Sequence, residues 1–252
     1  MSMVEPGFAV AYGGFLYLKH LWESWRTHRF GLYGTWGVGK TTLSRQLSTT
    51  GELEDVNPED YDTTTHHPFD PNLGRHLPPP TTRKRIAVQN TSTLKMARRT
   101  IVSTDLGGHP KYFDLWLRDM VSRNVEVVIY IIDHRHLRNP NDTTQQDTFR
   151  RFVDVIVDGD WPFTEKGLKR KAKTYKPLIV GLVANKADVW LDENWEKHWG
   201  TRRMNEHPIF QPFVADLSRL QRASIPTIKR PMSALRNWEV ESTIWDLLES
   251  KH

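Results

Sequence analysis

Residues 34–41, GTWGVGKT, combine the residue types that bind phosphate groups at the spacing that such a loop needs. Glycines let backbone N–H groups turn towards phosphate oxygens, and three fall in this segment: Gly34, Gly37 and Gly39. Lys40 can reach the outer phosphates, and the hydroxyl of Thr41 can ligate Mg²⁺. A strand predicted at 30–33 and a helix predicted from Thr41 supply the flanking elements. We therefore predict a loop that presents a helix N-terminus to bound phosphate.

A carboxylate, two glycines and an imidazole lie within DLGGH, residues 105–109. They follow a segment rich in β-branched residues, 100–104, which predicts a strand. Asp105 would hold Mg²⁺ through water, and the N–H of Gly108 would approach the terminal phosphate, where a side chain would obstruct it. His109 would orient the attacking water. The alternative is that His109 is a surface imidazole in a glycine-rich turn.

A third segment, NKAD at 185–188, has residues that can recognise a base. The carboxylate of Asp188 can accept hydrogen bonds from N1–H and the exocyclic amine of guanine. Adenine has an acceptor at N1 and no donor at C2, so it would leave the lone pairs of this carboxylate unpaired. Asn185 would tie this segment to the phosphate loop, and the stem of Lys186 would cover the base. After the last predicted strand come Ser233, Ala234 and Leu235, and the N–H of Ala234 is expected to donate to guanine O6.

The elements that must position these residues alternate between strands and helices. Strands are predicted at 30–33, 85–90, 99–104, 125–133, 177–188 and within 225–235. Helices are predicted from 41, at 112–122 and 143–158, through the Trp-rich region 189–223, and at 237–250, the last with Trp238, Trp245 and Leu248 on one side. This order predicts an α/β fold with a mostly parallel sheet covered by helices on both faces, and 85–90 pairing antiparallel with 99–104.

Three further segments have more than one interpretation. Apolar residues from Phe15 to Trp25 recur at helical spacing, which predicts either a packed helix or an amphipathic helix at a membrane interface. Residues 51–82 predict a long irregular loop. The basic run 165–176 predicts a solvated loop, with an anionic membrane surface or a nucleic-acid backbone as alternatives.

Composition narrows the classes of function. The chain has 252 residues, no cysteine and a net charge of +5. Disulfides, thiolate metal sites, cysteine nucleophiles and cysteine-linked lipids are therefore excluded. The charge surplus is too mild to favour nucleic acid as a partner. No secretory signal or membrane span is visible, so we expect a cytoplasmic protein that can associate peripherally with a membrane.

Together these motifs resemble those of the small GTPases, and most closely the Arf/Sar family. The narrower resemblance rests on DLGGH with Trp116 downstream, on GKTTL at 39–43, on the aromatic helix before the first strand, and on PTT at 80–82. It implies a P-loop GTPase domain at 29–252 after a helical extension at 1–28. Compared with that family, the chain has an enlarged switch I loop near 51–80 and inserts near 160–177 and 189–223.

The resemblance also implies a role for each matching residue. Residues that contact the nucleotide would be Gly34, Trp36, Gly37, Val38, Gly39, Lys40, Thr41, Thr42, Gly108, Asn185, Lys186, Asp188, Ser233, Ala234 and Leu235. Mg²⁺ would be held by Thr41, Thr81 and Asp105, and catalysis would involve Lys40, Thr81 and His109. Thr81 would be the switch I threonine because it follows Pro80 and precedes a strand, although Thr63, Thr64, Thr65 and Thr82 compete for that role.

The resulting expectation is a molecular switch that binds GTP or GDP with Mg²⁺ and hydrolyses GTP slowly, with an effector, an exchange factor and an activating protein as partners. Trp36 stands where Ras-like members have a small glycine, although Arf-type members also have a non-glycine residue there. Because a bulky group at this position could crowd an arginine finger or the attacking water, the alternative is a GTP-binding scaffold with negligible turnover. A third hypothesis, an ATP-dependent kinase or ATPase, is disfavoured by Asp188.

Overall fold

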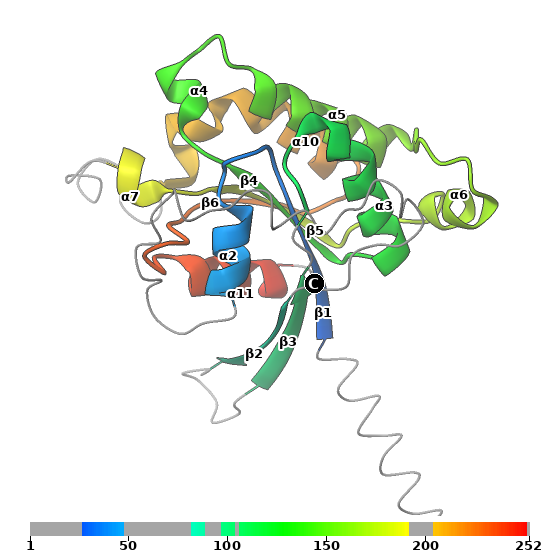
Figure 1. The fold of residues 1–252 in the computed structure, drawn as a ribbon, viewed down its shortest axis with the longest axis horizontal. Helices are drawn as coiled ribbons and strands as arrows, with labels where there is room; N and C mark the ends of the chain where they lie inside the picture. Colours follow the sequence, from blue (N-terminus) through cyan, green and yellow to red (C-terminus); the bar gives the residue numbers. More distant parts are fainter. Residues whose placement is uncertain (1–26, 48–81, 89–96, 104–105, 192–203, 251–252) are drawn as a thin grey trace, which may run out of the picture.

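The computed structural model describes residues 27–47, 82–88, 97–103, 106–191 and 204–250. Six strands of these ranges form one sheet in the order β2-β3-β1-β4-β5-β6 (Figure 1). The strands are β1 (Thr27–Tyr33), β2 (Thr82–Val88), β3 (Ala97–Ser103), β4 (Val127–Ile132), β5 (Ile179–Ala184) and β6 (Thr227–Pro231). β2 runs antiparallel to β3, and the other neighbouring strands are parallel. The predicted α/β class and the antiparallel pair are confirmed.

Helices cover both faces of this sheet, as Figure 1 shows. The α-helices are α2 (Lys40–Gln46), α3 (Phe113–Arg123), α4 (Arg135–Arg138), α5 (Thr144–Asp158), α6 (Lys166–Ala172), α7 (Ala187–Trp190), α10 (Val214–Arg222) and α11 (Val240–Glu249). Short 3-10 helices are η3 (Pro110–Tyr112), η4 (Met204–Glu206) and η5 (Pro208–Phe213). No described helix is long and apolar enough to cross a membrane.

Strand β4 shows why the central strands are apolar without interruption. All six of its residues are buried, because side chains on both faces of the sheet contact helices. Val127, Ile129 and Ile131 join the hydrophobic cluster beneath α2 and α11. Val128, Tyr130 and Ile132 join the cluster beneath α3, α5 and α10. The chain therefore has a hydrophobic core on each side of the sheet.

Two sequence-based expectations are wrong in their local structure. The basic segment was expected to be a loop, but residues 166–172 form α6. Leu168, Ala172 and Tyr175 pack against the core at helical spacing, and this pattern outweighs the surrounding charge. Trp238 was expected on the last helix, but α11 begins at Val240 and Trp238 instead pairs with Ser233 in an isolated β-bridge.

The remaining predicted elements match with shifted ends. The Trp-rich region contains α7, η4, η5 and α10, with Phe210 and Phe213 fully buried. The expected N-terminal helix and most of the loop 51–82 lie outside the described residues, as do Thr81 and Asp105.

Candidate functional site

The predicted site segments meet at the carboxyl edge of the sheet. The phosphate loop follows β1, residues 106–109 follow β3, and Asn185 and Ser233 follow β5 and β6. Because these strands are parallel, their carboxyl ends lie at the same edge. Ligands of open α/β sheets bind at such an edge.

The phosphate loop has a backbone that only glycine adopts readily. Gly34, Gly37 and Gly39 have φ angles of +141°, +77° and +91°. A Cβ on Gly34 would lie 2.3 Å from the carbonyl oxygen of Ile131, and one on Gly39 would lie 2.2 Å from Nδ2 of Asn185. The loop is therefore packed against the ends of β4 and β5 at Gly34 and Gly39, and a side chain at either position would displace a neighbouring group.

Lys40, the first residue of α2, returns to this loop. Its Nζ donates to the carbonyl oxygens of Gly34 and Thr35, each at 2.9 Å, and the residue is buried. The ammonium group is thus held within the curve of the loop, where a phosphate oxygen can replace a carbonyl acceptor. The hydroxyl-bearing Thr41 and Thr42 follow in the first turn of α2.

Residues 106–109 lie directly on the phosphate loop. A Cβ on Gly108 would be 2.4 Å from Nζ of Lys40 and 2.5 Å from the carbonyl carbon and oxygen of Thr35. The indole Nε1 of the fully buried Trp116 donates to the carbonyl oxygen of Gly107 at 2.9 Å, which anchors the segment to α3. The obstruction expected at position 108 therefore involves Lys40 and the loop backbone.

His109 is exposed at the start of η3. Its Nδ1 accepts a hydrogen bond from the backbone N–H of Lys111 at 3.2 Å. In the neutral ring this bond places the proton on Nε2, which leaves Nε2 as the nitrogen that can meet a ligand or a water. The geometry is compatible with both interpretations of this imidazole.

Asn185 joins three segments of the site. Its Nδ2 donates to the carbonyl oxygen of Val38 at 2.9 Å, so the predicted tie to the phosphate loop is present. Its Oδ1 accepts from the backbone N–H of Ala234 at 2.9 Å. The Ala234 N–H was expected to donate to guanine O6, and the structure instead directs it to Asn185.

The other residues predicted to contact the base lie in residues 185–188, which we call the base loop, and in residues 233–235. Asp188 is exposed in the first turn of α7. Lys186 adopts a left-handed conformation with φ +61°. Ser233 Oγ accepts from the N–H of Arg236 at 3.2 Å, and Leu235 is partly buried beside it.

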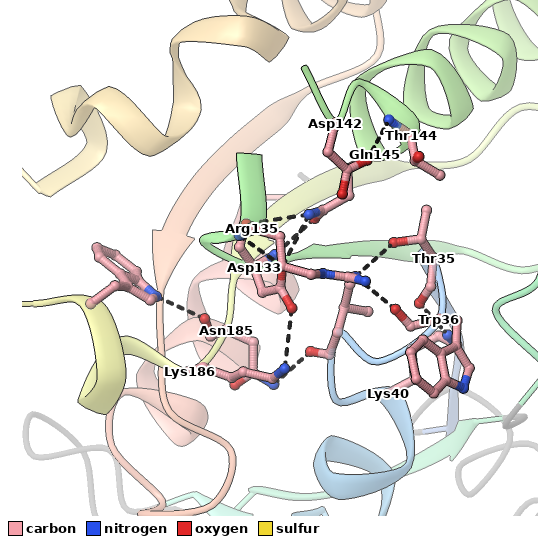
Figure 2. Close-up of polar contacts among 12 residues, drawn as sticks. Thr35, Trp36, Lys40, Asp133, Arg135, Asp142, Thr144, Gln145, Asn185 and Lys186 are labelled. Atoms are coloured by element: carbon pink, nitrogen blue, oxygen red, sulfur yellow. Dashed lines mark hydrogen bonds and ion pairs between the residues drawn. The ribbon is translucent and has the colours of Figure 1, made fainter. Parts of the chain in front are cut away.

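Asp133, which the sequence interpretation did not single out, connects the phosphate loop to the base loop (Figure 2). This fully buried carboxylate follows β4 directly and accepts from Nε of Arg135 at 2.9 Å and from Nζ of Lys186 at 3.1 Å. Gln145 of α5 makes two hydrogen bonds to Asp133: its Nε2 donates to the carboxylate at 3.0 Å, and its Oε1 accepts from the backbone N–H of Asp133 at 2.9 Å. The sequence feature that could have identified Asp133 is its place as a charged residue directly after a buried apolar strand.

The charge state of Asp133 follows from these contacts. Burial alone would raise its pKa, but the hydrogen bond from Arg135 and the positive charges of Lys186 and Arg135 outweigh burial, so the pKa lies below its ordinary value. Asp133 is therefore ionised at neutral pH, and it holds two cations beside the phosphate loop.

Of the three predicted metal ligands, only Thr41 belongs to the described residues. Among those residues no group of three or more histidine, aspartate or glutamate side chains could hold a metal ion. A Mg²⁺ ion held by one hydroxyl and by phosphate oxygens does not need such a cluster.

Comparison with known proteins gives no family for this chain. No protein-family model matches it, and no curated protein matches it. Among solved structures, it is similar to the Arl6 BBS3 small GTPase from Trypanosoma brucei with a bound nucleotide analogue, GppNp. The alignment covers 89% of this chain and 97% of that chain at 13% identity, with a TM-score of 0.45. At this level of similarity the function of that protein does not transfer to this chain.

Proposed function

We propose that this chain is a guanine-nucleotide switch that binds GTP or GDP with Mg²⁺ and hydrolyses GTP slowly. The observation that carries the proposal is the meeting of three separate segments at Lys40 and the phosphate loop. Gly108 lies against Lys40, and Asn185 connects the loop to the segment that contains Asp188. A nucleotide that spans this edge would contact all three segments.

Each residue then has a chemical role. Phosphate is bound by backbone N–H groups of the loop and by the N-terminus of α2. Lys40 exchanges its carbonyl acceptors for phosphate oxygens. Asp188 accepts from guanine, and Nε2 of His109 orients the attacking water. Thr41 would hold Mg²⁺ together with Thr81 and Asp105, and the ion supplies positive charge to the phosphate oxygens.

Loss of the terminal phosphate would remove a ligand from Gly108 and Lys40, so residues 106–109 would relax. We propose that effectors, an exchange factor and an activating protein read this change. Binding to an anionic membrane surface, through residues 1–28 or through α6, belongs to the same proposal. Flotation of the protein with anionic liposomes, in GTP and in GDP, tests the membrane part.

The test of the central proposal is single-turnover release of phosphate from GTP with Mg²⁺, followed by identification of the bound nucleotide. We expect GTP to become bound GDP, Asp188→Ala to lose the preference for GTP over ATP, and His109→Ala to bind GTP but hydrolyse it more slowly. Lys169→Ala, at an exposed lysine of α6 away from the loop, is the matched control. Equal affinity for ATP in the wild type contradicts the guanine assignment.

The second candidate, a GTP-binding scaffold with negligible turnover, is favoured by Trp36. Its side chain is 66% exposed at the phosphate loop. If the indole blocks an activating residue or the attacking water, Trp36→Gly should raise the rate of hydrolysis. An unchanged rate would show that Trp36 is not the brake.

A further inference from the structure

Arg135, at the start of α4, spans the gap between the end of β4 and the phosphate loop (Figure 2). On one side its Nε donates to Asp133 at 2.9 Å. On the other side its NH2 donates to the carbonyl oxygen of Trp36 at 2.6 Å and to the hydroxyl of Thr35 at 3.2 Å. Arg135 therefore holds the first half of the phosphate loop from the side of β4.

This contact differs from an ordinary surface ion pair. Exposed pairs contribute little because both side chains are solvated and mobile. Here the Asp133 side chain is 0% exposed and the Arg135 side chain 35% exposed, and the carboxylate is also held by Gln145 and Lys186. A guanidinium group suits this position because its rigid fork bonds the carboxylate through Nε and the loop through NH2 at the same time, whereas a lysine has a single nitrogen on a flexible stem.

The bond to Trp36 also controls the neighbouring peptide group. In a planar trans peptide, the C=O and the following N–H point in opposite directions. Because Arg135 holds the Trp36 carbonyl oxygen, the N–H of Gly37 points away from Arg135 and its orientation is fixed. An N–H that is already fixed in one orientation loses less conformational freedom when it donates to a phosphate oxygen.

We propose that Arg135 is a positioning residue for the bound nucleotide: it presets the Trp36–Gly37 peptide for phosphate binding and, through Asp133, couples the phosphate loop to the base loop at Lys186. This inference rests on the proposed function. Arg135 acts through the loop, so its loss should speed nucleotide release and leave the chemical step nearly unchanged.

The experiment compares the wild type with Arg135→Ala, Arg135→Gln and Arg135→Lys. Arg138→Ala is the control because Arg138 is exposed at the other end of the same short helix. For each protein we would measure release of fluorescently labelled GDP, single-turnover hydrolysis of preloaded GTP, and the thermal midpoint with and without GDP. Arg135→Gln and Arg135→Lys keep hydrogen-bonding groups if the alanine variant does not fold.

We expect GDP release to be about tenfold faster, or more, in Arg135→Ala, because hydrogen bonds of a charged group are lost. Arg135→Lys should recover only part of the difference, and Arg138→Ala should match the wild type. Hydrolysis of preloaded GTP should change less than about threefold, a much smaller effect than on release. In Arg135→Ala, the rise in thermal midpoint that GDP causes should be smaller than in the wild type. This reduction should exceed the difference between the midpoints of the two nucleotide-free proteins.

Three results would overturn the inference. Release at the wild-type rate in all Arg135 variants would show that the contact does not position the loop. A large loss of hydrolysis with unchanged release would make Arg135 catalytic, and a lower midpoint with a full GDP-induced rise would make it only structural. A wild type that binds no nucleotide would remove the proposed function and this inference together, whereas the first three results would remove the inference alone.

Discussion

One added carbon atom at position 108 would collide with both the phosphate-loop lysine and the loop backbone. It would lie 2.4 Å from Nζ of Lys40 and 2.5 Å from the carbonyl oxygen of Thr35. A flexible lysine can move aside, but the backbone of Thr35 cannot without displacing the loop. At the scale of single residues, the site therefore depends on glycine wherever two segments approach this closely.

We predict that Gly108→Ala lowers the affinity for GDP and GTP by about tenfold. The added methyl group would displace the phosphate loop, and overpacking of this kind costs about 1–3 kcal/mol. Equilibrium titration with labelled nucleotide measures the change. Gly167→Ala is the control, because a Cβ there meets nothing within 4 Å and alanine favours the helix α6. Wild-type affinity in Gly108→Ala would contradict the close approach.

At the scale of elements, α6 carries like charges on its outer face. Lys166, Lys169, Arg170 and Lys173 are exposed at helical spacing, and Leu168 and Ala172 face the core. Like charges three or four residues apart destabilise a helix by about 0.2–0.5 kcal/mol per pair. Core packing of the inner face therefore keeps this short helix folded against its own charge.

Arg170→Glu should convert two repulsive pairs, with Lys166 and Lys173, into attractive pairs and raise the thermal midpoint at low salt. The gain should decrease in about 0.5 M salt, because exposed charges are screened. Thermal unfolding followed by circular dichroism measures both values. Lys176→Glu makes the same change of net charge beyond the helix end, and an equal gain there would refute the pairwise explanation.

At the scale of the whole molecule, the histidines of interest are His134 and His136, which are both buried among the described residues. His136 of α4 contacts the carbonyl oxygen of Ile209 at 3.0 Å and the ring of Phe213, which links α4 to η5. Burial lowers the pKa of His136, although hydrogen bonds to backbone groups partly oppose this effect, and burial followed by the charge of Arg138 lowers the pKa of His134. Both rings are therefore favoured in the neutral form in the folded protein.

We predict that stability falls as the pH is lowered from about 7 to 5. In the unfolded chain these imidazoles bind protons near pH 6.5, whereas in the folded protein their pKa values are lower, so the unfolded state binds more protons in this range. The lowered pKa of Asp133 affects stability only below about pH 4, outside this window. Thermal midpoints across the range test the prediction, and His136→Gln should flatten the curve; an unchanged slope would contradict it.

The amino-acid sequence by itself determined the alternation of strands and helices and the segments of the site. Glycine spacing in the phosphate loop and the apolar run of β4 are local patterns, so they predict local structure without knowledge of the fold. Because parallel strands end at one edge, the order of elements also brought residues 34–41, 106–109 and 185–188 together.

Only the tertiary structure decided which polar groups pair at that edge. Arg135 could have pointed to solvent, and Lys186 could have lain apart from Asp133, because neither choice follows from neighbours in the chain. Asn185 takes the N–H of Ala234, which is 49 residues away. Such partners are selected by burial, since a buried carboxylate or amide must be satisfied by whatever group the fold brings within reach.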